Sequence, residues 1–361
     1  MVRVAAALAG KGCKTTIIMP HRDSEAFRDA CRRAGVDFIA LPISRITKEW
    51  RIASRYLALF PYEIWRLVRV LRAGGFDLVH VSGGSWQYKG VIAARLAGLP
   101  VIWHLNDTRM PGFIRRMFNP LAPLASGYIF TSHRTKEYYG QYVVKRSESI
   151  IPPPVFYPGR DNEEEQPSWM KADGELLVGT LANINPIKGL ETLIRAIAIL
   201  HERCVPIRLM IAGPVFTSQR VYHASLLELA RQLDVLDIIH WGGKLQDVHS
   251  FLQSLDVYVC SSVSESWGMS LWEAMAMARP IVSTDVSDVA RHVVDGESGF
   301  IVPVGDHEAM ADRILRLLED GEQARRFGQQ ARQIAVENFT PDIIASKTLD
   351  FYRRVLHPNK G

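Results

Sequence analysis

Short apolar runs, each followed by turn-forming residues, recur along most of the chain with helix-forming stretches between them. This alternation predicts parallel β-strands joined by crossover helices, because a strand buried on both faces reads as a continuous apolar run and needs a crossover to return the chain. The runs fall into two series. We expect strands at 15–19, 36–42, 76–81, 99–105 and 126–131 in the first, and at 175–181, 206–213, 237–243, 256–262, 279–285 and 298–304 in the second.

Residues 150–169, IIPPPVFYPGRDNEEEQPSW, lie between the two series and contain five prolines and an acidic run without periodicity. Such a segment is typical of a boundary between domains. We therefore predict an amino-terminal domain over 1–155, a linker over 156–174 and a second domain over 175–340. The predicted fold class is α/β, with two doubly wound, Rossmann-like domains, and ligands of such sheets bind at the carboxyl ends of the strands.

Composition agrees with a folded, two-domain protein. The 361 residues are 47% hydrophobic and 22% charged, enough to form two buried cores and too apolar for a disordered chain. No run of about 18 apolar residues is long enough to span a membrane, and no signal peptide is recognisable. The four cysteines (Cys13, Cys31, Cys204 and Cys260) show neither close pairing nor zinc-like spacing, which indicates a reducing compartment. We expect a cytoplasmic protein.

Residues 255–280, LDVYVCSSVSESWGMSLWEAMAMARP, predict a buried strand that runs through a polar turn directly into a helix. The helix is expected to begin near Gly268. Its first backbone N–H groups have no partner within the helix, and the helix dipole places a partial positive charge at the same end. The turn and helix start therefore predict an anion site, best suited to phosphate, formed by Ser266, Gly268, Met269 and Ser270.

Two acids flank this site. Glu265 precedes the helix start and Glu273 follows eight positions later. Taken singly, Glu273 is explained as a surface helix residue and Glu265 as a favourable charge near a helix start. Taken together, carboxylates beside an anion site suit a ligand that carries both phosphate and vicinal hydroxyls, because a carboxylate accepts hydrogen bonds from a diol. A sugar nucleotide is such a ligand.

The segment ESWGMSLWEAMA resembles the Glu-x7-Glu motif of retaining glycosyltransferases of the GT-B fold, family 4 or group 1. The resemblance extends over nearly the whole chain and implies a crevice between the two domains. It implies that Glu265 holds the donor sugar and Glu273 the ribose, and that no metal or other cofactor is required. It also implies that a last helix, residues 341–361, packs back on the amino-terminal domain.

Lys188 follows an apolar strand and a polar loop, next to a predicted helix start at Gly189. It suits a diphosphate, although a lysine at such a position is also explained as a solvated surface residue. The resemblance implies an arginine five positions earlier, where this chain has Asn183, whose amide can still donate to a phosphate oxygen. Gly213 ends the next strand, where the family approaches the donor, and a simple turn is an equally good interpretation.

In the first series, His104 lies at the end of the apolar run 99–105. A single histidine is usually structural, but the carboxyl end of a parallel strand faces the ligand site, and the resemblance implies a histidine here that contacts the donor sugar. Ser82, Gly83 and Gly84 form a flexible loop after another strand. They are candidates for the acceptor side or for an ordinary turn.

The sequence opens with an alanine-rich helical stretch that ends near Gly10 or Gly12, and the first strand follows. Members of the family begin with a strand and a glycine-rich loop before such a helix. We therefore expect the family's amino-terminal strand and loop to be absent from this chain, or another strand to take their place.

Residues 45–72 hold seven basic residues interleaved with aromatic and aliphatic ones. This composition predicts a pair of helices that lie on an anionic membrane surface, and an ordinary amphipathic helix with a solvated basic face explains it as well. The net charge of +5 brings no nucleic-acid-binding motif with it, so nucleic acid is not an expected partner. The basic residues are Arg45, Lys48, Arg51, Arg55, Arg66, Arg69 and Arg72.

These features together predict the retaining transfer of a sugar from a nucleoside-diphosphate sugar to a hydroxyl of a saccharide or lipid-linked acceptor. The expected process is assembly of a cell-surface polysaccharide or glycolipid, with the enzyme in the cytoplasm or peripheral on the inner face of the cytoplasmic membrane. Two alternatives remain open: a sugar-nucleotide-binding protein of the same fold without turnover, and a sugar-nucleotide epimerase.

Overall fold

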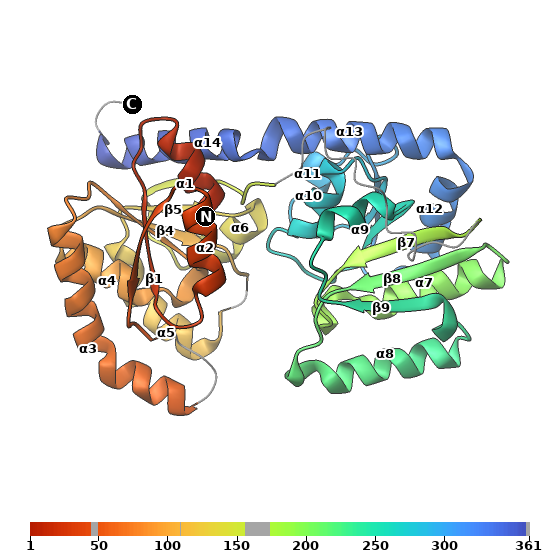
Figure 1. Cartoon of the computed structure of the whole chain (residues 1–361), viewed down its shortest axis with the longest axis horizontal. Coiled ribbons are helices and arrows are strands. Elements are labelled where there is room, and N and C mark those ends of the chain that lie inside the picture. Colours follow the sequence, from red (N-terminus) through yellow and green to blue (C-terminus); the bar gives the residue numbers. More distant parts are fainter. Residues whose placement is uncertain (45–49, 109, 156–173, 359–361) are drawn as a thin grey trace. The chain divides into compact units, whose positions relative to one another are not determined.

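The computed structural model describes residues 1–44, 50–108, 110–155 and 174–358, excepting the side chains of residues 50–55 and 57. The chain divides into two compact units (Figure 1). Unit 1 comprises Met1–Pro154 together with Pro341–Gly361, so the last helix belongs with the amino-terminal part of the chain. Unit 2 comprises Val155–Thr340.

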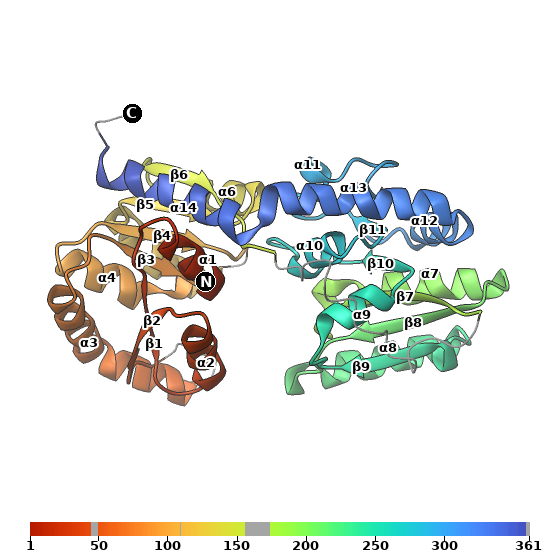
Figure 2. The ribbon, with the colours of Figure 1, turned by 45° about the horizontal axis from the view of Figure 1, so that its top comes forward.

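The strands of unit 1 form two parallel sheets, and no ladder joins β1 to β3 among the residues that are described. A helix, α1 (Val2–Ala9), precedes the first strand, as the sequence predicts. The two-stranded sheet contains β1 (Thr16–Pro20) and β2 (Asp37–Leu41); the four-stranded sheet has the order β3 (Val79–Ser82), β4 (Val101–Leu105), β5 (Gly127–Phe130) and β6 (Ser147–Ile150). The other helices are α2 (Glu25–Arg33), α3 (Trp50–Ala73), α4 (Tyr88–Leu96), α5 (Gly112–Leu121), α6 (His133–Gly140) and α14 (Pro341–Leu356) (Figure 2).

The central strands of the four-stranded sheet, β4 and β5, are buried on both faces. Successive side chains of β4 point to opposite faces, so Trp103 packs on one side against Phe118 while Ile102 packs on the other. The Ile102 face is covered by α1 and α14, through residues that include Val4 and Phe351. The carboxy-terminal helix is therefore part of the core of unit 1.

Helix α3 is a single helix of 24 residues that contains Pro61, where the sequence had suggested two helices. A proline inside a helix removes one backbone hydrogen bond. The helix continues because residues on both sides of Pro61 are buried, among them Tyr56, Ile64 and Leu67. Ile64 and Leu67 belong to the apolar core that α3 shares with α4. Packing thus outweighs the local preference.

A buried ion pair also joins α3 to α4. Glu63 and Lys89 are only 1% and 7% exposed, and the Lys89 ammonium contacts the Glu63 carboxylate directly. The backbone N–H of Ser44 donates to Glu63 Oε1 at 2.9 Å, and Lys89 Nζ donates to Ser44 Oγ at 2.9 Å. The pair therefore also fixes the chain just after β2.

Unit 2 contains one six-stranded parallel sheet, and all six strands predicted from the sequence are present. Its order is β12 (Phe300–Val302), β11 (Ile281–Thr284), β10 (Val257–Cys260), β7 (Leu176–Leu181), β8 (Ile207–Ala212) and β9 (Ile239–Gly243). From β7 the chain adds β8 and β9 on one side, and it then returns to add β10, β11 and β12 on the other side of β7. The helices are α7 (Leu190–Glu202), α8 (Arg220–Gln232), α9 (Val248–Ser254), α10 (Met269–Ala276), α11 (Val289–His292), α12 (His307–Glu319) and α13 (Gly321–Phe339).

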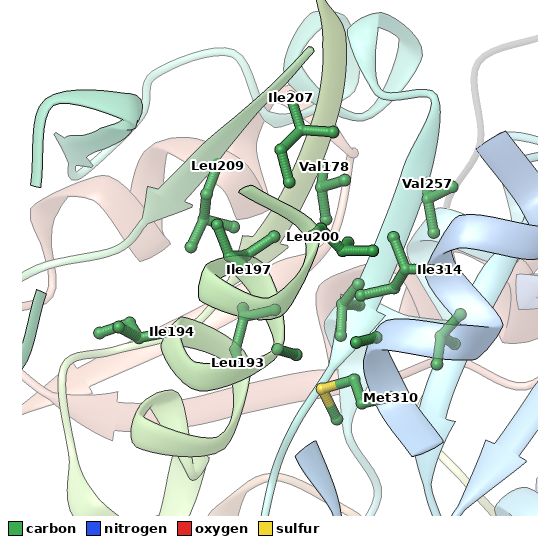
Figure 3. Packing of buried hydrophobic residues seen from close by; sticks show 14 of the residues in the cluster. Val178, Leu193, Ile194, Ile197, Leu200, Ile207, Leu209, Val257, Met310 and Ile314 are labelled. Carbon is green, nitrogen blue, oxygen red and sulfur yellow. The ribbon is translucent and has the colours of Figure 1, made fainter. Parts of the chain in front are cut away.

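Helices α7 and α12 cover one face of this sheet and form its larger core (Figure 3). Leu193, Ile197 and Leu200 lie on one side of α7 at helical spacing and pack on Val178 and Leu209 of the strands. Helix α10 covers the opposite face, so the sheet is buried on both sides. This rigid frame positions the loops at the carboxyl ends of β7, β8 and β10. None of the helices in the described ranges is long and apolar enough to cross a membrane.

Candidate functional site

The turn between β10 and α10 forms the helix start that the sequence predicts. Helix α10 begins at Met269, and Gly268 precedes it with a φ of +76°, a left-handed conformation that glycine adopts without strain. The N-cap residue, Gly268, has no side chain with which to cap the first N–H groups of the helix. They are therefore available to an anion, and the helix dipole favours one there.

A second loop, after β7, lies directly against this turn. Asn185 caps the short helix Pro186–Lys188, and Gly189 follows with a φ of +57°. A Cβ atom on Gly189 would lie 2.2 Å from the carbonyl oxygen of Ser261, so only glycine permits this approach. Two hydrogen bonds join the loops: Ser261 Oγ donates to the Lys188 carbonyl at 2.9 Å, and the Val263 N–H donates to the Ile187 carbonyl at 2.8 Å.

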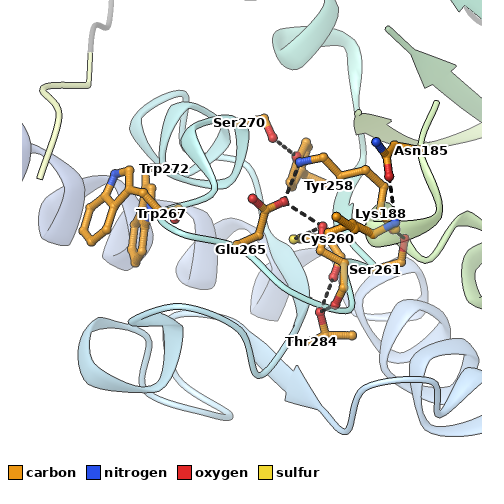
Figure 4. A network of polar contacts seen from close by, with 12 residues as sticks. Asn185, Lys188, Tyr258, Cys260, Ser261, Glu265, Trp267, Ser270, Trp272 and Thr284 are labelled. Carbon is orange, nitrogen blue, oxygen red and sulfur yellow. Dashed lines mark hydrogen bonds and ion pairs between the residues drawn. The ribbon is translucent and has the colours of Figure 1, made fainter. Parts of the chain in front are cut away.

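This approach brings Lys188 and Glu265 together (Figure 4). Lys188 Nζ lies 2.5 Å from Glu265 Oε1, and both side chains are mostly buried. Ser262 Oγ donates to the same carboxylate oxygen at 2.8 Å. A cation, a carboxylate and an uncapped helix start thus meet at the carboxyl edge of β7 and β10, an arrangement that can bind an anionic group and a hydroxyl-rich group side by side.

Aromatic side chains pack around the turn between β10 and α10. The rings of Trp267 and Trp272 stack with centroids 4.8 Å apart, and Phe339 and His292 contact both rings edge-on. Trp272 Nε1 donates to the Trp267 carbonyl at 2.8 Å. The turn therefore has little freedom to move when a ligand enters.

The remaining predicted residues of this turn occupy different environments. Ser270 Oγ accepts a hydrogen bond from the hydroxyl of buried Tyr258 at 2.8 Å, and the Ser266 carbonyl accepts one from Ser287 Oγ at 2.9 Å. Met269 and Glu273 are partly buried on α10. Their roles toward a ligand stay predictions.

Gly213 follows β8 at a tight crossing of loops. Its φ is +153°, and a Cβ atom there would lie 2.1 Å from the Ala182 carbonyl oxygen. Its N–H donates to the Gly243 carbonyl at 2.6 Å, so the loops after β7, β8 and β9 are in contact. Asn183, the next residue after Ala182, has an exposed side chain in this row of loops.

In unit 1, His104 lies in a buried histidine pair. His104 Nδ1 is 3.1 Å from His80 Nε2, and His80 Nδ1 is 2.6 Å from the hydroxyl of Tyr352 on α14. His104 is only 9% exposed, and its Nε2 is buried without a protein partner in the described structure. Burial lowers the pKa of His80 to about 4 and the pKa of His104 well below its usual value, so both rings are neutral at pH 7. His104 is therefore largely buried at the end of β4, and its contact with a donor sugar stays a prediction.

The loop after β3 meets the end of β4. Ser82 pairs with His104 in the parallel register, and the backbone of Gly83 and Gly84 has positive φ angles. A Cβ on Gly84 would lie 2.5 Å from Asp107 Oδ2. The Tyr139 hydroxyl donates to the other oxygen of Asp107, whose pKa is raised by burial. The acceptor-side role of residues 82–84 stays a prediction.

Sequence reasoning missed His80, Tyr352, Ser262 and Asp107. A histidine near the end of two consecutive apolar runs was a usable signal for the pair, because the carboxyl ends of adjacent parallel strands lie together. Nothing local indicated Tyr352, which is 272 residues from its partner. Among the described residues, no group of three or more His, Cys, Asp or Glu side chains is arranged to hold a metal ion.

Known proteins resemble both units. Residues 161–334 match the family described as "Glycosyl transferases group 1", and residues 1–156 match "Glycosyltransferase Family 4". A phosphatidyl-myo-inositol mannosyltransferase of Mycobacterium leprae is 31% identical over 301 residues, which cover 80% of this chain and 76% of that protein. The N-acetyl-alpha-D-glucosaminyl L-malate synthase of Bacillus anthracis is 28% identical over 203 residues, 56% of this chain and 51% of that protein. The chain thus spans about half the length of several curated relatives it matches.

Two solved structures share the fold. Anabaena Alr3699/HepE, in complex with UDP and glucose, has a TM-score of 0.80 at 18% identity, with 97% of this chain and 95% of that chain covered. A glycosyltransferase from Rickettsia africae has a TM-score of 0.81 at 15% identity, with 100% and 94% covered. The chain therefore belongs to the family 4, or group 1, glycosyltransferases and has their GT-B fold of two Rossmann-like units.

Proposed function

We propose that the protein is a retaining glycosyltransferase that moves a sugar from a nucleoside-diphosphate sugar to an acceptor hydroxyl. The observation that carries this proposal is the meeting of Lys188, Glu265 and the uncapped start of α10 at one edge of the unit 2 sheet. Relatives of two kinds support it. The solved relative HepE binds UDP and UDP-glucose, and the curated relatives include sugar transferases.

In this proposal the diphosphate binds at the start of α10 with the ammonium of Lys188 beside it. The departing nucleoside diphosphate gains negative charge as the glycosidic bond breaks, so fixed N–H groups and a cation stabilise the transition state more than the ground state. Glu265 accepts hydrogen bonds from the donor sugar and Glu273 from the ribose. The donor phosphate takes the proton of the acceptor hydroxyl. No metal or other cofactor takes part.

We further propose that the acceptor is a saccharide or a lipid-linked saccharide in polysaccharide or glycolipid assembly. Relatives named for capsular polysaccharide biosynthesis, lipopolysaccharide core biosynthesis and phosphatidyl-myo-inositol mannosylation support this class. The exposed face of α3 supports a peripheral position on an anionic membrane from the cytoplasmic side. Tyr62 and Trp65 are each 52% exposed and stack on one another, and the Arg69 guanidinium lies 4.9 Å over the Trp65 ring. Arg45 and Lys48, and the side chains of Arg51 and Arg55, lie outside the described part.

The decisive experiment incubates the purified protein with labelled UDP-, GDP-, ADP- and dTDP-sugars and a lipid-extract acceptor. Release of nucleoside diphosphate, with the labelled sugar joined to the acceptor in the same anomeric configuration that it had in the donor, supports the proposal. A changed sugar still attached to its nucleotide indicates an epimerase, and binding without any conversion indicates a protein without turnover.

The variant that tests the site is Lys188→Met, which keeps the length of the side chain and removes its charge. Because a hydrogen bond to a charged group contributes about 1.5–3 kcal/mol, the Kd of the nucleoside diphosphate should rise about 10- to 150-fold. Lys244→Met is the matched control, since Lys244 is an exposed lysine after β9. Equal affinity of Lys188→Met and wild type would remove Lys188 from the site.

A further inference from the structure

Glu265 is held through one of its two carboxylate oxygens. Oε1 receives both the Lys188 ammonium at 2.5 Å and the Ser262 hydroxyl at 2.8 Å. Within the described part of the chain, no protein group is hydrogen-bonded to Oε2. A carboxylate fixed at one oxygen presents the other in a defined direction, which is what a hydrogen bond to a ligand hydroxyl requires.

Ser262 is itself fixed from two directions. Its carbonyl oxygen accepts a hydrogen bond from Thr284 Oγ1 on β11 at 2.6 Å, and its hydroxyl oxygen lies 3.7 Å from Cys260 Sγ, which donates to it. Ser262 is 3% exposed and Thr284 is fully buried, so neither reaches a ligand. Burial and the nearby charge of Glu265 raise the pKa of Cys260, which keeps its S–H as the donor. The single proton of Ser262 is thereby directed at Glu265.

The two partners of Oε1 differ in what a ligand would do to them. A diphosphate at the start of α10 attracts the Lys188 ammonium and competes with Glu265 for it, whereas the buried Ser262 hydroxyl has no other acceptor to turn to among the contacts described. When Lys188 changes partner, Ser262 alone holds a carboxylate that the phosphate charge repels. Without Ser262, the Glu265 carboxylate would be free to rotate away from the donor sugar once the diphosphate has bound.

We propose that Ser262 is a positioning residue for Glu265, and that Lys188 exchanges Glu265 for the diphosphate on donor binding while Ser262 keeps Glu265 Oε2 directed at the donor sugar. This inference rests on the proposed function. Two parts of the ligand then depend on different residues. The nucleoside diphosphate depends on Lys188, and the sugar depends on the Ser262–Glu265 contact.

The test compares the affinities of UDP and UDP-glucose for single and double variants by calorimetry, with GDP and GDP-mannose as the second pair of probes. Ser262→Ala should weaken binding of the sugar nucleotide about tenfold, since it removes a hydrogen bond to a charged group, and leave the diphosphate within twofold. Ser262→Thr keeps the hydroxyl and should restore binding of the sugar nucleotide. Ser283→Ala is the matched control, because Ser283 is a buried serine on β11 whose hydroxyl donates to the Thr284 carbonyl at 2.9 Å.

A double-variant cycle shows whether Ser262 acts through Glu265. Adding Ser262→Ala to Glu265→Ala should cause no further loss, because the residue being positioned is gone. Glu265→Ala should bind UDP at least as tightly as wild type, since Lys188 no longer has a competing partner. A simple structural role for Ser262 predicts the opposite: additive losses, and equal weakening of UDP and UDP-glucose.

Unchanged affinity of Ser262→Ala for the sugar nucleotide, additive losses in the cycle, or the same loss in Ser283→Ala would each overturn the inference and leave the proposed function standing. A wild-type protein that binds none of the UDP-, GDP-, ADP- and dTDP-sugars would overturn the proposed function itself. Loss of UDP affinity in Glu265→Ala would overturn the partner exchange of Lys188.

Discussion

The buried histidine pair should make unit 1 unstable in mild acid. His80 and His104 are neutral in the folded protein because burial disfavours their charged forms. In the unfolded chain each ring takes up a proton near its ordinary pKa of 6.5. Their contribution to stability is therefore complete above pH 6.5 and is lost as the pH falls from 6.5 toward the folded pKa.

The size of the effect follows from His80, whose folded pKa is about 4. Between pH 7 and pH 5 the unfolded state gains a proton that the folded state does not, which lowers the free energy of unfolding by about 2 kcal/mol. His104 changes stability in the same direction. For a unit of this size, 1 kcal/mol corresponds to about 2–4 °C, so His80 alone should lower the Tm of unit 1 by about 4–8 °C.

Scanning calorimetry at pH 7, 6 and 5 measures this directly. The double variant His80→Gln/His104→Gln keeps polar partners for the Tyr352 hydroxyl but cannot titrate, so its Tm should fall less than that of wild type over the same range. His357→Gln is the control, because His357 is an exposed histidine in the same unit. Equal losses in wild type and the double variant would show that the pair is not the source of the acid sensitivity.

Two further predictions concern the surface and core of unit 1. Lys89→Met leaves Glu63 as an unpaired buried charge and should destabilise unit 1 by about 3–5 kcal/mol in urea unfolding, whereas Lys89→Met with Glu63→Leu should recover most of the loss. The protein should sediment with anionic vesicles at low salt and less at high salt, because the attraction is screened. The double variant Arg66→Glu/Arg69→Glu should no longer sediment with the vesicles. The control Arg325→Glu/Arg326→Glu changes the net charge by the same amount and should still sediment. Equal sedimentation with neutral vesicles would contradict a charge-dependent attachment.

Most strands of unit 2 were predictable because they are apolar runs buried on both faces, as in 257–260. Strand β6 (Ser147–Ile150) was missed because three of its four residues are polar and its first two are exposed at the sheet edge, where backbone pairing to β5 defines it. Residues 45–72 were predicted to form a pair of helices from their composition, and Pro61 by itself would favour a break within α3. Packing on α4, a tertiary effect, decides otherwise.

The turn between Glu265 and Gly268 was predictable for a similar reason, since its chemistry is contained in consecutive residues. The contact of Lys188 with Glu265 joins residues 77 positions apart in the sequence. The pairing of β7 with β10 in the sheet brings them together. Ser262 offered no signal of its own, because one serine among several near a turn has no distinctive pattern. The contact of His104 with His80 was not predicted, because it depends on the pairing of two strands whose histidines lie 24 residues apart in the sequence.

The stacked pair of Trp267 and Trp272 gives the molecule a built-in optical reporter. Two indole rings held rigidly 4.8 Å apart couple their electronic transitions, so their near-ultraviolet circular dichroism depends on the angle and distance between them. Trp267 lies between Glu265 and Gly268 in the same turn, and Phe339 fixes its ring from the end of α13. A ligand that shifts this turn by a fraction of an ångström would change that signal without any label, because the indole bands extend to longer wavelengths than those of most nucleotides.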